Sequence, residues 1–499
     1  MRLSHDQLIL AGLRALLLGT VFALSLFPLT SYDVWLHLGI GRRIVERMEV
    51  PRAAWGCRIY PDREWVAHEW GAQALFHQVH SFGGERGLVL LRAAAATLAA
   101  ALLLWALSEA GAGPFTGCAA TAVASSIGFS QLFWPARPQI FTQLLLPLLL
   151  AALLRGRAGK RRVLYGVPIL FIPWVNLHGG YVLGLVVIAI FLFADLVQGL
   201  FGRQGAAGWR KTLILLLLAS TAACLINPYT YRSLVYPFIY YLGEPITAGN
   251  IEWNPLVLHQ FALYEALIVI TAISILLARP GPDLLEGTLA FAFFHLSVIS
   301  QRHVPLGAMV LAVVLGASWS RWWKAFPDSP VGPIARLGAA IRMSPPRRAG
   351  LVLVVMLASF AAIWFSRTPP WWLEKSKWGG GSPLPVAASS FLEREGLTEG
   401  LFNQYEWGGY LLYRFPDKDV VSIDGRNDVY GADHIRLYME AMEGIPTWKD
   451  TFDLWEIRVA MISRRSPGWG LRFVLAQDPD WEARFQGENA LVFVRKERR

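Results

Sequence analysis

Charged residues are scarce in this chain of 499 residues. Asp, Glu, Lys and Arg together make up 16% of the sequence, hydrophobic residues make up 54%, and the mean hydropathy is +0.40. A soluble protein of this length normally carries about a quarter charged residues. The shortage argues against a soluble globular protein and favours a polytopic membrane protein.

Cysteine is also scarce, since the chain contains only Cys57, Cys118 and Cys224. Three scattered cysteines are too few for a disulfide framework or a zinc site. A signal-peptide cleavage pattern of small residues is missing after the first apolar run, which ends in "VFALSLFPLTSYD". We therefore expect an uncleaved first membrane helix.

The apolar residues that are present form long runs. Crossing the hydrocarbon core of a bilayer takes roughly 17–25 residues. The candidate segments are 8–29, 86–108, 114–134, 138–154, 162–177, 180–201, 211–227, 260–278, 284–301, 304–322 and 350–366. The predicted fold class is a polytopic α-helical membrane protein with about eleven transmembrane helices.

Basic residues concentrate in the linkers 155–162, 202–211 and 323–349. Eleven alternating crossings place these linkers on one side, which the positive-inside rule makes cytoplasmic together with the N-terminus. The net charge of +10 is then a topology signal, and no nucleic-acid partner is expected. We expect a multi-pass protein of the bacterial inner membrane, with membrane lipids around it.

The tail differs from the rest of the chain. We expect a transmembrane domain over 1–366, with a long first external loop at 30–85, and an extracytoplasmic α/β domain over 367–499. Short segments of the tail have the alternation of strands and helices that is typical of an α/β domain. Strands are expected at "KDVVSID" and "IRVAMIS", a helix at "HIRLYMEAMEG", and a final hairpin with Gly487 at its turn.

Unusual polar and aromatic side chains gather on the face that this topology makes external. They are Asp33, His37, Glu69, Arg137, Asn176, His178, Glu252, Trp253, Arg302 and His303, joined in the tail by Trp407, Tyr410, Asp424 and Arg426. Polar groups are costly near a membrane interior, so their collection on one face indicates a functional surface.

Several of these residues also have a structural interpretation. Asp33 fits the first turn of an interfacial helix, where an acid is stabilised by the helix dipole. Arg137 fits a cation that extends to lipid headgroups. Asp424 and Arg426 fit a salt bridge that fixes their loop, and "WGGY" fits a helix start packed close to a strand.

A lipid-phosphate-linked sugar donor would use each part of this surface. Its phosphate would meet Arg137, Arg302, His303 and His178, because guanidinium groups suit phosphate oxygens. A carboxylate at Asp33 would accept the acceptor's proton during attack. Cationic side chains would stabilise the departing phosphate.

The layout resembles the GT-C superfamily of integral-membrane glycosyltransferases, whose members carry an essential acid directly after the first helix. The matching residue is Asp33 in "SYDVWLHLGIGRRI". Further marks of similar bacterial membrane proteins are "N-x-H-G", "E-W-x-P", "W-G-G-Y" and "D-G-R-x-D-x-Y". They occur here as Asn176–Gly179, Glu252–Pro255, Trp407–Tyr410 and Asp424–Tyr430.

The resemblance implies transfer of a sugar from a polyprenyl-phosphate donor to an extracytoplasmic glycan, lipid or protein acceptor, with Asp33 as general base. The remaining marked residues are assigned to substrate binding: His37, Glu69, Asn176, Glu252, Trp253, Trp407, Tyr410, Asp424 and Arg426. Related families show two adjacent acids in the first loop, whereas Val34 follows Asp33 here. A need for a divalent cation, Mg²⁺ or Mn²⁺, therefore stays open, and no cofactor is assigned.

Two other functions stay open. A transporter or lipid flippase would place charges near the bilayer midplane and often shows two related halves, whereas the polar groups here lie at one rim. A non-catalytic assembly subunit would tolerate loss of Asp33.

Overall fold

The computed structural model describes residues 4–29, 31–130, 136–202, 207–242, 251–278, 280–325, 345–366, 384–464 and 470–496. The chain forms two compact units. Unit 1 comprises Met1–Phe27, Val89–Ile226 and Asn250–Leu373, and unit 2 comprises Pro28–Leu88, Asn227–Gly249 and Glu374–Arg499. Residues of the first loop thus belong to the same unit as the tail, a grouping that sequence analysis did not contain.

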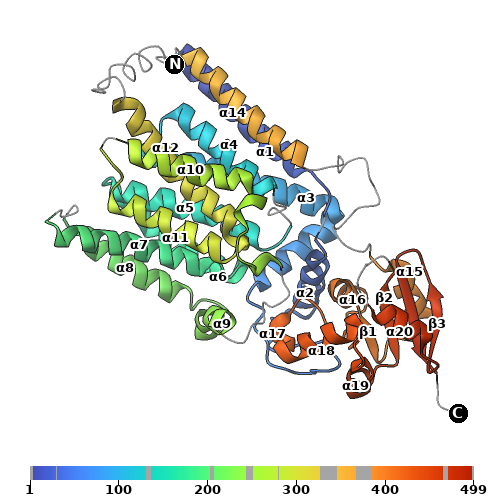
Figure 1. Ribbon diagram of the computed structural model, residues 1–499. Coiled ribbons are helices and arrows are strands. Elements are labelled where there is room, and N and C mark those ends of the chain that lie inside the picture. The colour runs from blue at the N-terminus through green and yellow to red at the C-terminus, as the bar shows by residue number, and fades with distance from the viewer. Residues whose placement is uncertain are drawn as a thin grey trace. The chain divides into compact units, whose positions relative to one another are not determined.

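Unit 1 is built from helices (Figure 1). They are α1 (His5–Ser25), the later part of α3 (Trp70–Glu109), α4 (Pro114–Ser130), α5 (Gln139–Arg157), α6 (Val167–Leu177), α7 (Tyr181–Leu200), α8 (Trp209–Ala223), α10 (Ala262–Leu277), α11 (Leu284–Ile299), α12 (Val304–Ala325) and α14 (Pro345–Ser366). Short 3₁₀ helices lie at η1 (Arg161–Gly166), η2 (Ile251–Trp253), η3 (Leu258–Gln260) and η4 (Gln301–His303).

Helix α12 forms the centre of unit 1. It packs against α4, α10 and α11, while α1 and α14 lie side by side (Figure 1). Small residues allow close helix approach: Gly316 faces Leu107 of α3, and Gly307 faces the Tyr264 hydroxyl of α10. A side chain at either glycine would collide with its neighbour.

Five helical segments of the described chain are long and apolar enough to cross a membrane. They are His5–Ser25, Trp70–Glu109, Gln139–Arg157, Tyr181–Leu200 and Gln301–Trp322. Shorter apolar helices cover Ala262–Leu277, Leu284–Ile299 and Ala349–Ala361. A helix lies in each of the eleven segments expected from sequence. The chain is a multi-pass membrane protein, while the count of eleven crossings stays a prediction.

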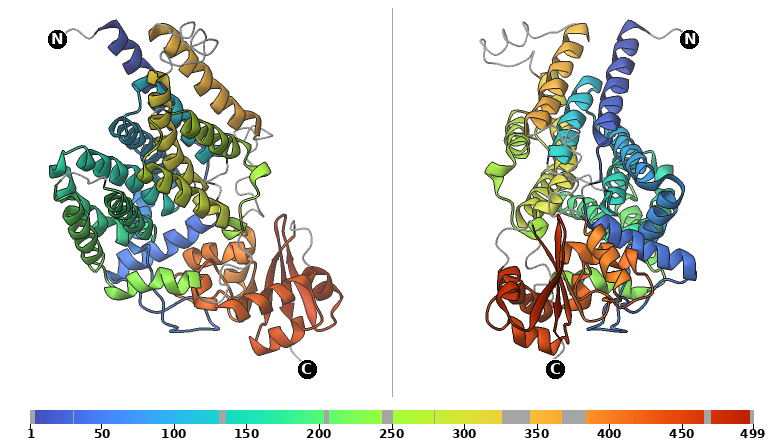
Figure 2. Two further views of the ribbon diagram at one scale, coloured as in Figure 1. Left: turned by 60° about the vertical axis from the view of Figure 1, so that its left-hand side comes forward. Right: turned by 90° about the vertical axis from the view of Figure 1, so that its right-hand side faces the viewer.

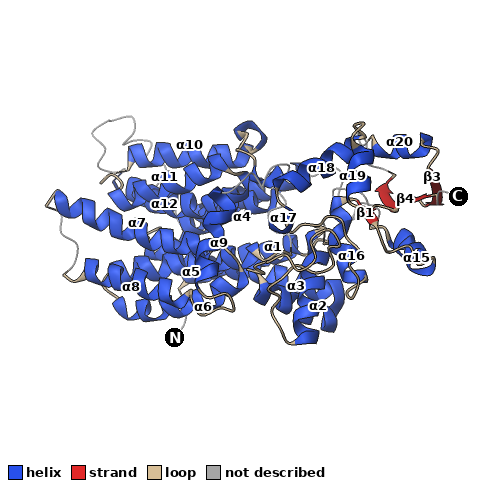
Figure 3. Ribbon diagram, turned by 90° about the horizontal axis from the view of Figure 1, so that it is seen from below, coloured by secondary structure: helices blue, strands red, loops and turns tan. Residues whose placement is uncertain are grey.

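Unit 2 combines helices with the strands of the chain, which Figure 3 shows confined to one region of the described residues. Its helices are α2 (Asp33–Arg47), the start of α3, α9 (Tyr231–Leu242), α15 (Val386–Arg394), η6 (Tyr405–Trp407), α16 (Gly408–Arg414), α17 (Asn427–Tyr430), α18 (Ala432–Glu443), α19 (Trp448–Leu454) and α20 (Leu471–Gln477). Its strands are β1 (Leu401–Asn403), β2 (Val459–Ser463), β3 (Trp481–Gln486) and β4 (Ala490–Arg495).

The sheet of unit 2 has the strand order β1-β2-β4-β3. Strand β1 runs parallel to β2, and the other pairs are antiparallel. Figure 2 shows the strands with helices packed around them. The predicted helix at 434–444, the strand at 457–463 and the hairpin with Gly487 at its turn are all confirmed.

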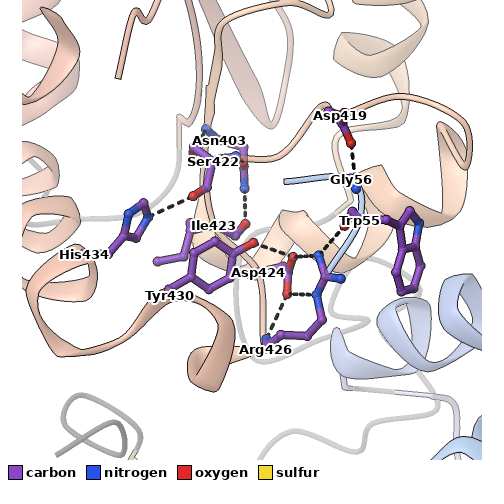
Figure 4. A network of polar contacts seen from close by, with 10 residues as sticks. All are labelled: Trp55, Gly56, Asn403, Asp419, Ser422, Ile423, Asp424, Arg426, Tyr430 and His434. Atoms are coloured by element: carbon purple, nitrogen blue, oxygen red, sulfur yellow. Dashed lines mark hydrogen bonds and ion pairs between the residues drawn. The ribbon is translucent and has the colours of Figure 1, made fainter. Parts of the chain in front are cut away.

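The strand expected at "KDVVSID" is wrong in part. Among residues 418–424, only Val421 forms a strand-like bridge, with Cys57 of the first loop, and residues 420–424 are buried. Side chains satisfy the neighbouring backbone groups: Asn403 binds the Ser422 amide and the Ile423 carbonyl, and His434 donates to the Ser422 carbonyl (Figure 4). The alternating apolar pattern is therefore that of a buried segment held by side chains.

Helices α2 and α16 pack closely because glycines line their contact. A Cβ on Gly409 would lie 2.8 Å from the backbone nitrogen of Leu36, and a Cβ on Gly41 would lie 2.0 Å from the carbonyl oxygen of Gln73 in α3. One hydrophobic core joins α2 and the first loop to the sheet and its helices, and includes Leu36, Cys57 and Trp407. The first loop and the tail therefore fold as one body.

Candidate active site

Asp33 is the first residue of α2 in unit 2 and is half-buried. The N-terminal end of a helix favours an ionised carboxylate. A Cβ placed on the exposed Gly425 would lie 3.6 Å from Oδ1 of Asp33. The acid of the first loop thus lies beside the "DGRNDVY" loop of the tail.

His37 lies one helical turn after Asp33 and faces Glu69. Its Nδ1 is 4.0 Å from Oε2 of Glu69 and 3.4 Å from Nε2 of Gln73. The other carboxylate oxygen of Glu69 is 3.8 Å from Nε2 of His68. The structure therefore places the predicted residues Glu69 and His37 together and adds a second imidazole.

Asp428 and Tyr236 extend this group, and sequence reasoning missed both as site residues. The Tyr236 hydroxyl, from α9, donates to Oδ2 of Asp428 over 2.9 Å. The rings of Tyr236 and His68 are 4.8 Å apart and tilted by 30°. Burial raises the pKa of Asp428, opposed by the nearby His68 and by the Tyr236 hydroxyl.

We refer to these side chains of unit 2 as the acid–imidazole cluster: Asp33, His37, His68, Glu69, Tyr236 and Asp428. The only signal for Asp428 in the sequence was its place in the "DGRNDVY" motif, where it reads as a turn residue. Tyr236 lies in the apolar run "SLVYPF" and carried no signal.

Asp424 and Arg426 instead form a buried salt bridge (Figure 4). Arg426 donates from Nη2 to Oδ2 of Asp424 over 2.7 Å and from Nε to Oδ1 over 2.9 Å. Tyr430 donates to the same Oδ2 over 2.6 Å, and Arg426 also reaches the Trp55 carbonyl. Burial lowers the pKa of Arg426, but the Asp424 carboxylate outweighs it, so the net shift is upward. This geometry agrees with the interpretation of Asp424 and Arg426 as a salt bridge that fixes their loop.

Trp407 and Tyr410 occupy packing positions. Trp407 is fully buried in the core of unit 2, and Tyr410 is buried with its ring perpendicular to Trp35 at 5.7 Å. Burial raises the pKa of the Tyr410 hydroxyl. Gly408 is the first residue of α16, and a Cβ at this position would lie 2.2 Å from the Ile423 carbonyl oxygen. The motif "WGGY" is therefore a helix start packed closely against the backbone at Ile423.

A second group of predicted residues comes together within unit 1. Arg137, just before α5, donates from Nη1 to Oε1 of Glu252 over 2.5 Å. The Arg302 guanidinium lies 4.9 Å from the ring centroid of Trp253. Helices η2 and η4 are in contact, and Ser300 donates to the Glu252 carbonyl. We call Arg137, Glu252, Trp253 and Arg302 the arginine–tryptophan cluster; His303 beside it is buried.

His178 is oriented by hydrogen bonds at the turn between α6 and α7. Trp174 Nε1 donates to Thr142 Oγ1, which lies 2.7 Å from Nδ1 of His178. Nδ1 accepts from the Gly180 amide. The imidazole proton therefore lies on Nε2. Nearby, Asn176 donates to the carbonyls of Ile172 and Ile226 and so fastens the end of α6.

A divalent cation finds no ready ligand set in the described ranges. Within them, no group of three or more His, Cys, Asp or Glu side chains is arranged to hold a metal ion. We therefore derive no step through Mg²⁺ or Mn²⁺.

Solved structures similar to this chain are membrane glycosyltransferases. The oligosaccharyltransferase AglB from Archaeoglobus fulgidus, in complex with an inhibitory peptide and a dolichol-phosphate, superposes with a TM-score of 0.62 at 14% identity, over 90% of this chain and 69% of that one. The mycobacterial arabinofuranosyltransferase AftD gives 0.59 at 15% identity, over 100% and 40% of the two chains. ArnT from Cupriavidus metallidurans, bound to undecaprenyl phosphate, gives 0.52 at 12% identity, over 97% of both chains.

No protein-family model and no curated protein sequence matches the chain. The structural similarities establish the fold, and they confirm the resemblance to GT-C glycosyltransferases at that level. One structure of the Archaeoglobus enzyme contains Zn and sulfate.

Proposed function

We propose that this protein is a glycosyltransferase that moves a sugar from a polyprenyl-phosphate donor to an acceptor, with Asp33 as general base. The observation that carries the proposal is the position of Asp33: it lies at the start of α2, beside Gly425 and within the acid–imidazole cluster, in a fold shared with enzymes of this class.

The reaction follows from the chemistry of these groups. The acceptor's hydroxyl or amine attacks the anomeric carbon while its proton passes to the Asp33 carboxylate. The bond between that carbon and the phosphate oxygen breaks, and polyprenyl phosphate departs with the electron pair. Arg137, Arg302, His303 and His178 are assigned to the lipid phosphate, and the guanidinium groups of Arg137 and Arg302 would stabilise its developing charge.

The proposal includes a location. Catalysis would occur on the membrane face opposite the basic linkers, which is the extracytoplasmic face of a bacterial inner membrane. Residues 367–499 would then form an extracytoplasmic domain that helps to bind a glycan, lipid or protein acceptor. The remaining predicted residues His37, Glu69, Asn176, Glu252, Trp253, Trp407 and Tyr410 would shape or support the substrate site.

The test uses the purified full-length protein in lipid nanodiscs. Undecaprenyl-phosphate donors carrying radiolabelled glucose, galactose, mannose or arabinose are supplied with envelope extract as acceptor, and transferred sugar is measured. We expect one donor to be consumed, and Asp33→Asn to slow transfer by about 10²–10⁴-fold without changing the denaturation midpoint. Asp433→Asn is the matched control, because its side chain is 95% exposed.

Consumption of none of the donors, or full activity of Asp33→Asn, would contradict the proposal. Movement of intact labelled lipid between leaflets, unaffected by Asp33→Asn, would instead favour a flippase.

A further inference from the structure

Successive side chains of the loop 424–430 point to different surroundings. Asp424 and Arg426 bind each other in the buried network, whereas Gly425 lies against Asp33. Asp428 lies at α9, with Tyr236 as its hydrogen-bonding side chain. Two residues of the loop thus face the acid–imidazole cluster: the exposed Gly425 lies near Asp33, and the carboxyl group of Asp428 lies near Tyr236.

Asp428 has an unusual environment for an acid. The Tyr236 hydroxyl donates to Oδ2 of Asp428 over 2.9 Å, and the ring of His68 lies 4.8 Å from that of Tyr236. A partly buried carboxyl group is stabilised by hydrogen-bonding partners of this kind. Burial raises the pKa of Asp428, and the nearby His68, Tyr236 and Arg426 oppose that shift.

The chemistry of this corner suits an uncharged polyol. A carboxyl group accepts or shares hydrogen bonds with hydroxyls, a phenol both donates and accepts, and an imidazole offers a polar edge beside an apolar face. The side chain of His68 is 33% exposed.

We propose that Asp428, Tyr236 and His68 form the subsite that recognises the hydroxyl groups of the transferred sugar. This inference rests on the proposed function and assigns the sugar end of the donor to residues from the tail, α9 and the first loop.

The experiment compares binding of two probes to the full-length protein in nanodiscs. One is undecaprenyl phosphate, and the other is the same lipid phosphate carrying the sugar that the transfer assay selects. The wild-type protein should prefer the sugar-bearing lipid. Asp428→Asn should reduce that preference by about tenfold and Tyr236→Phe by about threefold, the scale of one hydrogen bond. Affinity for bare undecaprenyl phosphate should stay unchanged in both variants.

Asp433→Asn is again the control and should keep the preference. A purely structural role of Asp428 would weaken binding of both lipids and lower the denaturation midpoint, and that result would overturn the inference. An intact preference in Asp428→Asn and Tyr236→Phe would overturn it as well. If Asp428→Asn does not fold, Tyr236→Phe and His68→Ala decide.

Failure of the inference is distinguishable from failure of the proposed function. If donor is consumed and Asp33→Asn is inactive while Asp428→Asn keeps its preference, only the sugar subsite is wrong. If no donor is consumed and the wild-type protein does not prefer a sugar-bearing lipid, both are wrong.

Discussion

Two polar regions of unit 2 both use an acid of the motif "DGRNDVY", but they differ in how deeply their acids are buried. In the Asp424 network, Asp424 accepts hydrogen bonds of 2.6–2.9 Å from Arg426 and Tyr430 and is completely buried. In the acid–imidazole cluster, contacts of Glu69 with His37 and His68 are 3.8–4.0 Å, and Asp33 and Asp428 are half-buried. A completely buried network stabilises the fold, whereas the half-buried acids of the cluster stay partly accessible from outside unit 2.

The largest expected effect tests whether the Asp424 network is structural. Asp424→Asn leaves the Arg426 guanidinium buried without its counter-charge, so the free energy of unfolding should fall by about 3–5 kcal/mol. Thermal denaturation followed by tryptophan fluorescence measures the loss, with Asp433→Asn as the exposed control. A normal midpoint together with lost sugar transfer would place Asp424 with the substrate instead.

A second prediction concerns pH, because His434 is held neutral beside the same network. Burial lowers its pKa to about 4, against the opposing hydrogen bond to the Ser422 carbonyl, and its ring stacks on Trp455 at 4.1 Å. The unfolded state takes up a proton near pH 6.5 and the folded state does not, so stability is present above pH 6.5 and is lost as the pH falls toward 4. The difference of about 2.5 pH units corresponds to about 3 kcal/mol.

Measurement of the denaturation midpoint between pH 7.5 and 4.5 tests this. His434→Gln, which keeps a donor for Ser422, should flatten the profile, while the exposed His5→Gln should not. Asp428 has the opposite effect on stability. Its pKa is raised in the folded state, so its protonation favours the folded state as the pH falls. An equally steep profile in His434→Gln would refute the assignment.

A third, smaller effect tests how the cluster is held in place. Gly409→Ala would put a Cβ 2.8 Å from the α2 backbone at Leu36, so α16 or α2 must shift. Overpacking of this kind costs about 1–3 kcal/mol, and Asp33 on α2 would be displaced with it. We expect a lowered denaturation midpoint and slower sugar transfer. Gly83→Ala, with open space around its Cβ, is the matched control, and equal behaviour of the two variants would contradict this packing argument.

The contrast between the two regions also shows what a single sequence can reveal. Local patterns predicted the helix after Asp33 and the final hairpin, because each depends on residues close together in the chain. They gave the Asp424–Arg426 salt bridge only as an alternative to substrate binding. The contact between Tyr236 and Asp428 spans 192 positions, and nothing in the apolar run around Tyr236 marks it. The segment 418–424 has the sequence pattern of a strand, but the side chains of Asn403 and His434 bind much of its buried part, residues 420–424.

The smallest expected effect compares the ion pairs of the two units. Arg137 and Glu252 in unit 1 are 18% and 34% exposed at their side chains, unlike the enclosed Asp424–Arg426 pair. Solvent screening limits such a pair to about 0–1 kcal/mol, so a double-mutant cycle of Arg137→Gln and Glu252→Gln should show weak coupling in stability. The two variants should change lipid-phosphate binding in opposite directions. Glu252→Gln removes a negative charge beside Arg137 and should tighten binding of undecaprenyl phosphate by a few-fold, whereas Arg137→Gln should weaken it. Both effects should be smaller at high salt. Strong coupling in stability with unchanged lipid binding would instead make this pair a structural counterpart of the Asp424 network.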